Sequence, residues 1–167
     1  MSLRTRILAS PETLSELAWA AEQRFIEAET LINSRRLPGA VYLFGIASEI
    51  WLKLACFRFL GNGPASRVDG QLGPAKAWMQ RNAPSVRHEG YHSLQFWADY
   101  LVLRRVERGN PLPKDLAGQL RHHVVNRLFW DWKVDVRYRV AILSDQDGRR
   151  VHHDAGWVRN VRDKLWR

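Results

Sequence analysis

The stretch PGAVYLFGIASEIWLKLACFRFL, residues 38–60, decides the fold of this chain. Wound as a helix, it carries apolar side chains on almost every face, and Gly61 supplies a stop at its end. A helix that is apolar all round belongs in the middle of a bundle. Glu49, Lys53 and Arg58 interrupt the run, so the pattern predicts a buried helix rather than a membrane span.

Helical patterns on both sides of this segment predict the rest of the bundle. A first helix begins with Ser10 as N-cap and Pro11 at its first position, and ends near Ser34. The later predicted helices are Pro74–Gln80, Ser93–Arg108, Pro113–Trp130 and a last helix that Asp154 caps and that reaches Leu165. Residues 132–143 alternate apolar and charged side chains, which predicts an extended connector, and residues 144–148 predict a turn.

No internal repeat, low-complexity tract or linker divides the chain. Its 167 residues suit one domain with a real core. Short loops between long helices favour antiparallel neighbours. We therefore expect residues 1–167 to form a single all-α domain, an antiparallel up-and-down bundle of about five helices.

Charge and cysteine content restrict the partners and the compartment. The formal net charge is +9, and 16 of the 26 Lys and Arg residues follow Ala83, against 10 of the 17 Asp and Glu residues. Such an excess attracts phosphate-bearing partners and acidic protein surfaces alike. The single cysteine, Cys56, lies in the apolar run, which predicts a small buried hydrophobe and favours a reducing cytoplasm as the location.

Glu49 and Lys53 are the most informative polar pair. They lie four residues apart with the carboxylate first, the favourable order for a helical ion pair. On a helix this apolar, an unpaired charge is expensive. Two interpretations remain open: a structural ion pair that fixes helix packing, or Lys53 presented to a phosphate or acidic partner with Glu49 positioning it.

The segment around this pair resembles a known family. Gly39 to Lys53, read as Gly-Ala-x-Tyr-Leu-x-Gly-x-Ala-x-Glu-x-x-Leu-Lys, is similar to the second helix of HEPN domains, the nucleotide-binding family of higher eukaryotes and prokaryotes. Tyr91-His92-Ser93-Leu94 resembles the His-x-Leu that opens a following helix in that family. Trp132 through Arg137-Tyr138 resembles its Trp and Arg-Tyr before the last helix. The likeness covers most of residues 11–166.

The HEPN resemblance implies both partners and a site. It implies a homodimer through an apolar helix face, and a minimal nucleotidyltransferase as partner in many members. RNA or a nucleotide is the implied ligand, and toxin–antitoxin or defence systems are a frequent setting. The ligand-binding residues that it implies here are Glu49, Lys53, His92, Arg137 and Tyr138. No cofactor is implied.

The catalytic branch of the family uses an Arg and, a few residues later, a His on the last helix. In this chain Arg159-Asn160 lies there, but no His follows. The spacing is matched instead by Arg81-Asn82 and His88, in a segment that contains Pro84, where helical register cannot hold. Arg81 and His88 are therefore read either as a catalytic pair of a metal-independent ribonuclease or as surface loop residues.

Two histidine pairs and two tryptophans remain. His122 and His123 are adjacent on a predicted helix and point about 100° apart, so we expect one to pack and the other to be solvated. His152-His153 is read as a basic turn before the Asp154 cap, or as a phosphate site at a helix N-terminus. Trp130 and Trp132 either stack on bases or pack in the core.

No metal-binding motif appears: there is neither His-Glu-x-x-His nor a Cys–His spacing, so the sequence predicts no metal site. Phosphate-loop and Gly-x-Ser-x-Gly signatures are missing as well. Three functions stay open. The leading one is a non-catalytic HEPN-like module that binds a nucleotide, RNA or a nucleotidyltransferase. The others are a metal-independent ribonuclease and a purely structural oligomerisation module.

Overall fold

The computed structural model describes residues 12–84, 92–133, 136 and 143–167. Within these ranges every regular element is a helix, which confirms the predicted all-α bundle. The elements are α2 (Leu14–Asn33), α3 (Leu37–Phe59), α4 (Asp69–Asn82), α5 (Leu94–Glu107), α6 (Lys114–Leu120), the π-helix η1 (Arg121–Leu128), α7 (Phe129–Asp131) and α8 (Asp145–Trp166).

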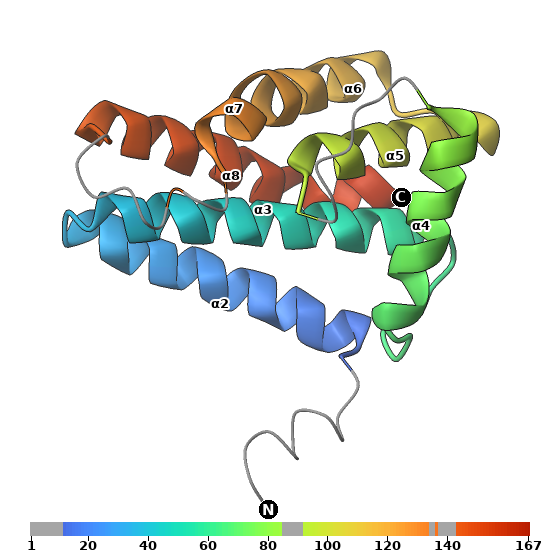
Figure 1. Cartoon of the computed structure of the whole chain (residues 1–167), viewed down its shortest axis with the longest axis horizontal. Coiled ribbons are helices and arrows are strands. Elements are labelled where there is room, and N and C mark those ends of the chain that lie inside the picture. Colours follow the sequence, from blue (N-terminus) through green and yellow to red (C-terminus); the bar gives the residue numbers. More distant parts are fainter. Residues whose placement is uncertain (1–11, 85–91, 134–135, 137–142) are drawn as a thin grey trace, which may run out of the picture.

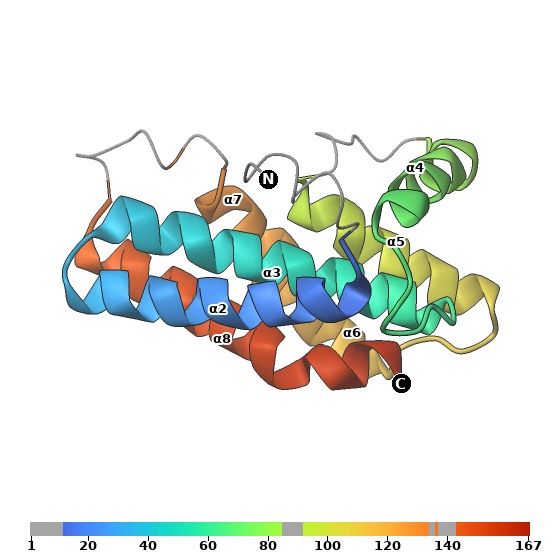
Figure 2. The ribbon, with the colours of Figure 1, turned by 90° about the horizontal axis from the view of Figure 1, so that it is seen from below.

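Helix α3 lies at the centre of the bundle, packed against α2, α8 and α5 (Figures 1 and 2). Helices α2 and α3 run antiparallel, and the continuous run α6–η1–α7 is antiparallel to α8. Helix α4 stands across the end of the bundle where α3 finishes, so that α5 starts again alongside α3 and runs in the same direction (Figure 1). Neighbours joined by a short turn are thus antiparallel, and the crossing helix interrupts the alternation.

Helix α2 begins with a capping box. The Thr13 hydroxyl accepts the backbone N–H of Glu16 at 3.3 Å, and the Glu16 carboxylate accepts the backbone N–H of Thr13 at 2.9 Å. Each side chain satisfies a backbone donor that the first helical turn leaves free. The backbone N–H and the hydroxyl of Thr13 each donate to the Glu16 carboxylate at 2.9 Å, and these two hydrogen bonds lower the pKa of Glu16. The predicted cap, Ser10, lies outside the described residues.

Helix α3 is the core helix that its sequence predicts. It is long and apolar enough to cross a membrane, but 78% of its most apolar window is buried inside the bundle. At Gly45 the ring of Trp132 lies so close that an added Cβ would fall 2.2 Å from ring atoms. The Trp132 indole N–H donates to the Tyr42 carbonyl at 3.1 Å, and the side chain is buried. Trp132 is therefore a packing residue that holds the end of α7 against α3.

Cys56, also on α3, behaves as the small buried hydrophobe that the sequence predicts. The side chain is buried, and its thiol donates a weak hydrogen bond to the Trp97 carbonyl at 3.4 Å. Burial raises the pKa of the Cys56 thiol far above its usual range. A thiol in this environment is unreactive as long as the protein stays folded.

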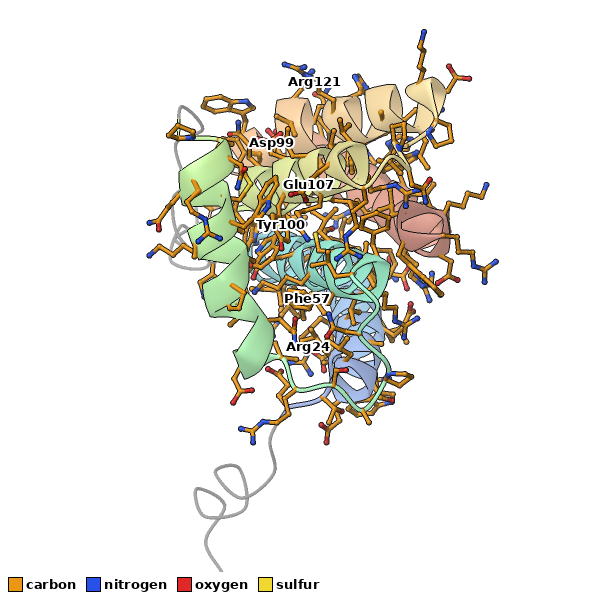
Figure 3. The ribbon with its side chains drawn as sticks, turned by 90° about the vertical axis from the view of Figure 1, so that its right-hand side faces the viewer. Arg24, Phe57, Asp99, Tyr100, Glu107 and Arg121 are labelled. Carbon is orange, nitrogen blue, oxygen red and sulfur yellow. The ribbon has the colours of Figure 1, made fainter. Side chains whose placement is uncertain are left out.

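Helix α4 is longer than predicted, and it closes the end of the bundle. It begins at Asp69 rather than at Pro74, which the helix accommodates in its interior. Trp78 packs edge-on against Tyr100 of α5 at 5.6 Å, and its indole N–H donates to Glu107 at 3.2 Å. Figure 3 shows Tyr100 inside the bundle and Arg121 pointing outward from η1. Helix α4 is thus held against α5 by aromatic packing and by a hydrogen bond at the edge of that contact.

The last helix corrects the sequence prediction. Ser144, not Asp154, is its N-cap: the Ser144 hydroxyl accepts the Asp147 N–H at 3.3 Å, and the Asp147 carboxylate accepts the Ser144 N–H at 2.9 Å. Residues 144–148, predicted as a turn, are the capping box and first turn of α8. Asp154 consequently lies in the middle of α8 and is fully buried.

Candidate functional site

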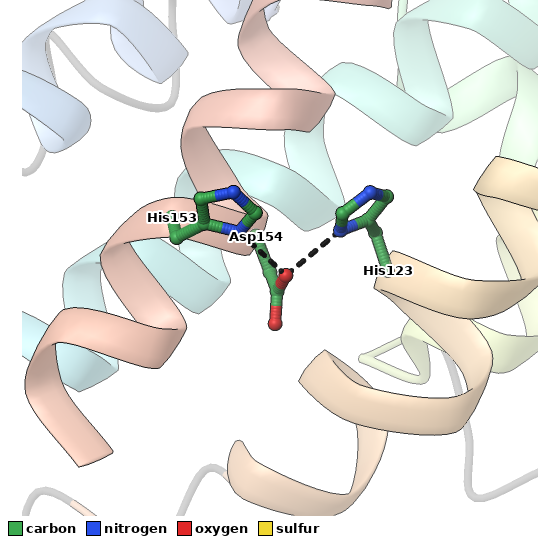
Figure 4. A group of neighbouring side chains, drawn as sticks. All are labelled: His123, His153 and Asp154. Carbon is green, nitrogen blue, oxygen red and sulfur yellow. Dashed lines mark hydrogen bonds and ion pairs between the residues drawn. The ribbon is translucent and has the colours of Figure 1, made fainter. Parts of the chain in front are cut away.

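A cluster of polar side chains lies where η1 packs against α8 (Figure 4). In a π-helix each N–H bonds five residues back instead of four, and such segments occur frequently at functional sites. Here the π-helical segment contributes His123 and Arg127, and α8 contributes His153 and Asp154. We call these four residues the η1–α8 cluster.

One buried carboxylate organises the cluster. The Nδ1 of His123 lies 2.8 Å from Oδ1 of Asp154, and the Nδ1 of His153 lies 3.1 Å from the same oxygen (Figure 4). A carboxylate accepts hydrogen bonds, so it selects the form of each ring in which Nδ1 carries a proton. The Nε2 atom of both rings then lies on the side away from the carboxylate (Figure 4).

Arg127 completes the cluster on the other carboxylate oxygen. Its Nε lies 2.8 Å from Oδ2 of Asp154, an ion pair by distance. The geometry is not that of an aligned hydrogen bond, and both atoms lack a hydrogen-bond partner among the described residues. A fully buried carboxylate without a counter-charge would be strongly destabilising, and the guanidinium of Arg127 supplies a positive charge beside Asp154.

Packing around the histidines limits their freedom. The ring of Trp157 stacks on His123, with centroids 4.7 Å apart and planes 19° apart, and its indole N–H donates to Gln119 at 3.1 Å. His123 keeps only 13% of its side chain exposed, whereas His153 keeps 68%. The cluster therefore has a fixed inner imidazole and an outer one open to solvent.

Basic and aromatic side chains are also exposed on the helices that carry the cluster or directly follow it. Trp130 is 70% exposed, and Arg149 is exposed on α8. Arg150 is already engaged, because Asp131 accepts from its Nε at 2.6 Å and Asp147 from its Nη2 at 2.8 Å. These contacts, that with Asp131 first, raise the pKa of Arg150. Trp130 and Arg149 are thus open to a ligand, while Arg150 holds α7 to α8.

No family model matches this chain, and no curated protein or solved structure does either. What the η1–α8 cluster can do must follow from its own chemistry. Imidazole and guanidinium groups are the usual protein donors to phosphate oxygens. Two imidazoles on one carboxylate are also a geometry for proton transfer and for metal coordination.

Three residues that the HEPN resemblance implies as ligand contacts do come together. Glu49 and Lys53 form an ion pair in the interior, with 3% and 11% of their side chains exposed, and Nδ1 of His92 lies 3.2 Å from the second Glu49 oxygen. The Lys53 ammonium also lies 5.5 Å from the centre of the Trp97 ring. The Lys53 ammonium thus contacts Glu49 and Trp97 in the interior. Such internal contacts agree with the interpretation of Glu49 and Lys53 as a structural ion pair.

The structure does not describe the other two residues that the resemblance implies. Arg137 and Tyr138 lie outside the described residues, and so does His88. Arg81 is exposed in the last turn of α4. The catalytic pairing of Arg81 with His88 therefore stays a prediction.

The structure confirms the prediction for one histidine pair and corrects it for the other. His122 is exposed while His123 packs, as the sequence predicts for adjacent helical residues. The prediction for His152-His153 was wrong: both lie in the middle of α8, not at a helix N-terminus. His152 stacks on Phe44 with centroids 4.9 Å apart and lies 3.4 Å from Glu29.

A separate pocket of about 310 Å³ opens between α2, α3 and α8. Its aromatic lining includes Trp19 and Trp166, and its basic lining includes Arg58 and Arg162. Such a hollow has the size of a small ligand pocket. Glu22 and Asp163 line it as well, and Arg162 already pairs with Glu22 at 3.4 Å, so the pocket offers an aromatic ligand stacking partners together with charges of both signs.

Proposed function

We propose that this chain is a non-catalytic module of the HEPN type that binds single-stranded RNA or a nucleotide through its phosphates. The observation that supports this most is the η1–α8 cluster, in which His123, His153 and Arg127 gather on one buried carboxylate at the surface of a chain with a net charge of +9. A doubly protonated imidazole donates Nδ1–H to Asp154 and keeps Nε2–H for a phosphate oxygen.

The surroundings suit a nucleic acid better than a protein partner. Exposed Trp130 offers a face on which a base can stack, and Arg149, exposed on α8 four residues before His153, adds a guanidinium on that face of the helix. Phosphate contacts combined with one or two stacking rings are typical of sequence-tolerant binding to single strands.

The biological setting follows from the same proposal. We place the protein in the cytoplasm, as a homodimer, with a minimal nucleotidyltransferase as its partner, in a toxin–antitoxin or other defence system. The HEPN resemblance is the only support for the dimer and for that partner. A pull-down that looks for a minimal nucleotidyltransferase among the proteins that co-purify, and a measurement of molar mass in solution, test these two expectations directly.

A second candidate, a metal-independent ribonuclease, is favoured by one specific observation. Asp154 orients two imidazoles, so that one can take the proton of a ribose 2′-hydroxyl while the other protonates the leaving 5′-oxygen. Arg127 would then stabilise charge on the phosphate. In this second candidate the reaction would take place at His123 and His153 rather than at Arg81 and His88.

The test is a binding and cleavage assay without metal. Purified, tag-free protein in EDTA is incubated with labelled single-stranded RNA over a salt series and run on native and denaturing gels. We expect a shift that weakens as salt rises, because phosphate contacts release counterions, with the RNA intact. Failure to shift at the lowest salt would contradict the proposal.

Variants locate the site. His153→Ala removes an exposed ring and should weaken the shift, whereas His122→Ala, its matched control on η1, should not. Loss of binding in Trp19→Ala instead would move the site to the α2–α3–α8 pocket. Cleavage that disappears in His153→Ala would establish the ribonuclease, and cleavage that disappears in Arg81→Ala would restore the pair predicted from the sequence.

A further inference from the structure

Three atoms of the η1–α8 cluster are arranged like the ligands of a metal ion. One ring nitrogen from each of His123 and His153 and a carboxylate oxygen of Asp154 all lie within 4.8 Å of one another. The Nδ1 atoms of both rings approach the same oxygen, at 2.8 and 3.1 Å. Around tetrahedral zinc, with bonds of about 2.0–2.1 Å, neighbouring ligand atoms stand roughly 3.3 Å apart. The two nitrogen–oxygen separations therefore need to lengthen by a few tenths of an ångström, and the two nitrogens, which stand up to 4.8 Å apart, need to approach by about 1.5 Å, which a rotation of the largely exposed His153 ring can supply.

The chemistry of the donors fits a transition metal rather than calcium or magnesium. Imidazole suits zinc, nickel, copper and iron, whereas hard cations prefer sites made of oxygen atoms alone. Two His and one carboxylate, with a further position left for water, is a ligand set known from open zinc sites. His153 is largely solvent-exposed, so the side of the cluster that it borders gives an ion and a water molecule access.

The surrounding residues hold these ligands in place. Asp154 is fully buried in the middle of α8, so its carboxylate has little freedom. Arg127 pairs with Oδ2 and leaves Oδ1 as the single ligand oxygen, the kind of support that outer residues give to metal-binding carboxylates. Stacking on Trp157 fixes the plane of His123.

Arg127 also opposes a dication by charge repulsion. The guanidinium and the Asp154 carboxylate neutralise each other, which leaves two neutral imidazoles as the main attraction. The affinity expected is accordingly below that of structural zinc sites with several thiolates.

We propose that His123, His153 and Asp154 bind one divalent transition-metal ion, of the zinc, cobalt or nickel class, with a coordination position open to water. On binding, each ring coordinates through Nδ1, and its proton moves to Nε2 through solvent. The Nε2–H groups then point away from the ion as donors. That they meet phosphate oxygens there rests on the proposed function, whereas metal binding itself does not.

The test uses the metal alone. Tag-free, EDTA-treated full-length protein is titrated with Co²⁺ while its visible absorption is recorded, and with Zn²⁺ in a calorimeter. We expect one equivalent to bind and Zn²⁺ to displace Co²⁺. Because loss of an outer partner already lowers metal affinity by about 10–100-fold, loss of a ligand in His153→Ala should lower it at least as much.

Two further variants complete the design. His122→Ala, a solvated histidine beside His123, should bind like the wild type. Asp154→Asn tests the buried ligand, with far-UV circular dichroism to verify its fold, and His153→Ala stays informative if that variant unfolds. No saturable binding, or equal binding by wild type and His153→Ala, overturns the metal site. An RNA shift in EDTA is measured separately, so loss of the metal site leaves the proposed function standing.

Discussion

Replacing Lys53 by Met asks whether the Glu49–Lys53 pair is structural. The side chain of Met fills the space of the Lys stem but removes the ammonium group. Glu49 would then keep only the imidazole of His92, 3.2 Å away, as a partner among the contacts that the structure describes. The interior around it is apolar, so the carboxylate would remain buried without a full counter-charge.

The expected loss follows from that burial. Removing one partner of a buried ion pair costs about 3–5 kcal/mol. The remaining contact with His92 places Lys53→Met at the lower end, about 3 kcal/mol. The double variant Glu49→Leu/Lys53→Met has no buried charge left, and we expect it to lie within about 1 kcal/mol of the wild type. The double variant should therefore be more stable than Lys53→Met by about 2 kcal/mol.

Urea unfolding followed by circular dichroism measures these differences as shifts of the midpoint at constant slope. Arg24→Met is the matched control, because the Arg24–Glu27 pair is more than 40% exposed and such pairs contribute less than about 1 kcal/mol. A loss in Lys53→Met no larger than in Arg24→Met would refute the structural reasoning. If RNA binding fell at the same time, Lys53 would be a ligand contact.

Three further outcomes are expected. Gly45→Ala should destabilise the fold by about 3 kcal/mol or more in a thermal melt, since its Cβ would overlap a buried indole, while Gly118→Ala, with nothing within 4 Å, should stabilise its helix by up to about 1 kcal/mol. Hydrogen bonds from Ser144 lower the pKa of Asp147, so their contribution to the stability of the fold is present above about pH 4 and is lost in acid. Urea titrations should show that Ser144→Ala costs about 1 kcal/mol of stability at pH 7 and less at pH 3. Cys56 should resist alkylation in native protein and react only in denaturant, as followed by mass spectrometry.

The sequence predicts the central part of the fold well because the signal there is strong. Residues 38–60 are apolar on all faces, and the structure buries them as α3. Helix α5 begins about where predicted, and the Ser93 hydroxyl at its start accepts the Phe96 N–H at 3.2 Å. In both cases local chemistry and burial favour the same boundary.

The last helix shows where this reasoning fails. Ser144 and Asp147 form a capping box, but with Gly148 they also match a turn, and Asp154 with its neighbours matches a cap equally well. The choice between Ser144 and Asp154 as the start of the helix depends on which residues of α8 become buried. That burial comes in part from packing against η1, which is distant in the sequence. The spacing of Val151, Ala155 and Val158, all buried, was the available signal for the longer helix.

The η1–α8 cluster could not be predicted from local sequence patterns, because its residues are far apart in the sequence. His123 and Asp154 are 31 residues apart, on two helices that meet only in the folded chain. Sequence periodicity does not distinguish a π-helical segment from an α-helical one, so the direction of Arg127 was not predictable either. Motif searches for metal or catalytic spacings test neighbours in sequence and miss such groups.

The most direct test of the central proposal observes the histidines themselves. Long-range ¹H–¹⁵N spectra of the six imidazoles are recorded in EDTA while unlabelled single-stranded RNA is added. We predict saturable shifts of the His153 and His123 resonances, with the His153 signal identified by its absence from the spectrum of His153→Ala, and with His92 unchanged. Stationary His123 and His153 resonances at RNA concentrations that saturate the gel shift would show that the ligand binds elsewhere and would contradict the proposed site.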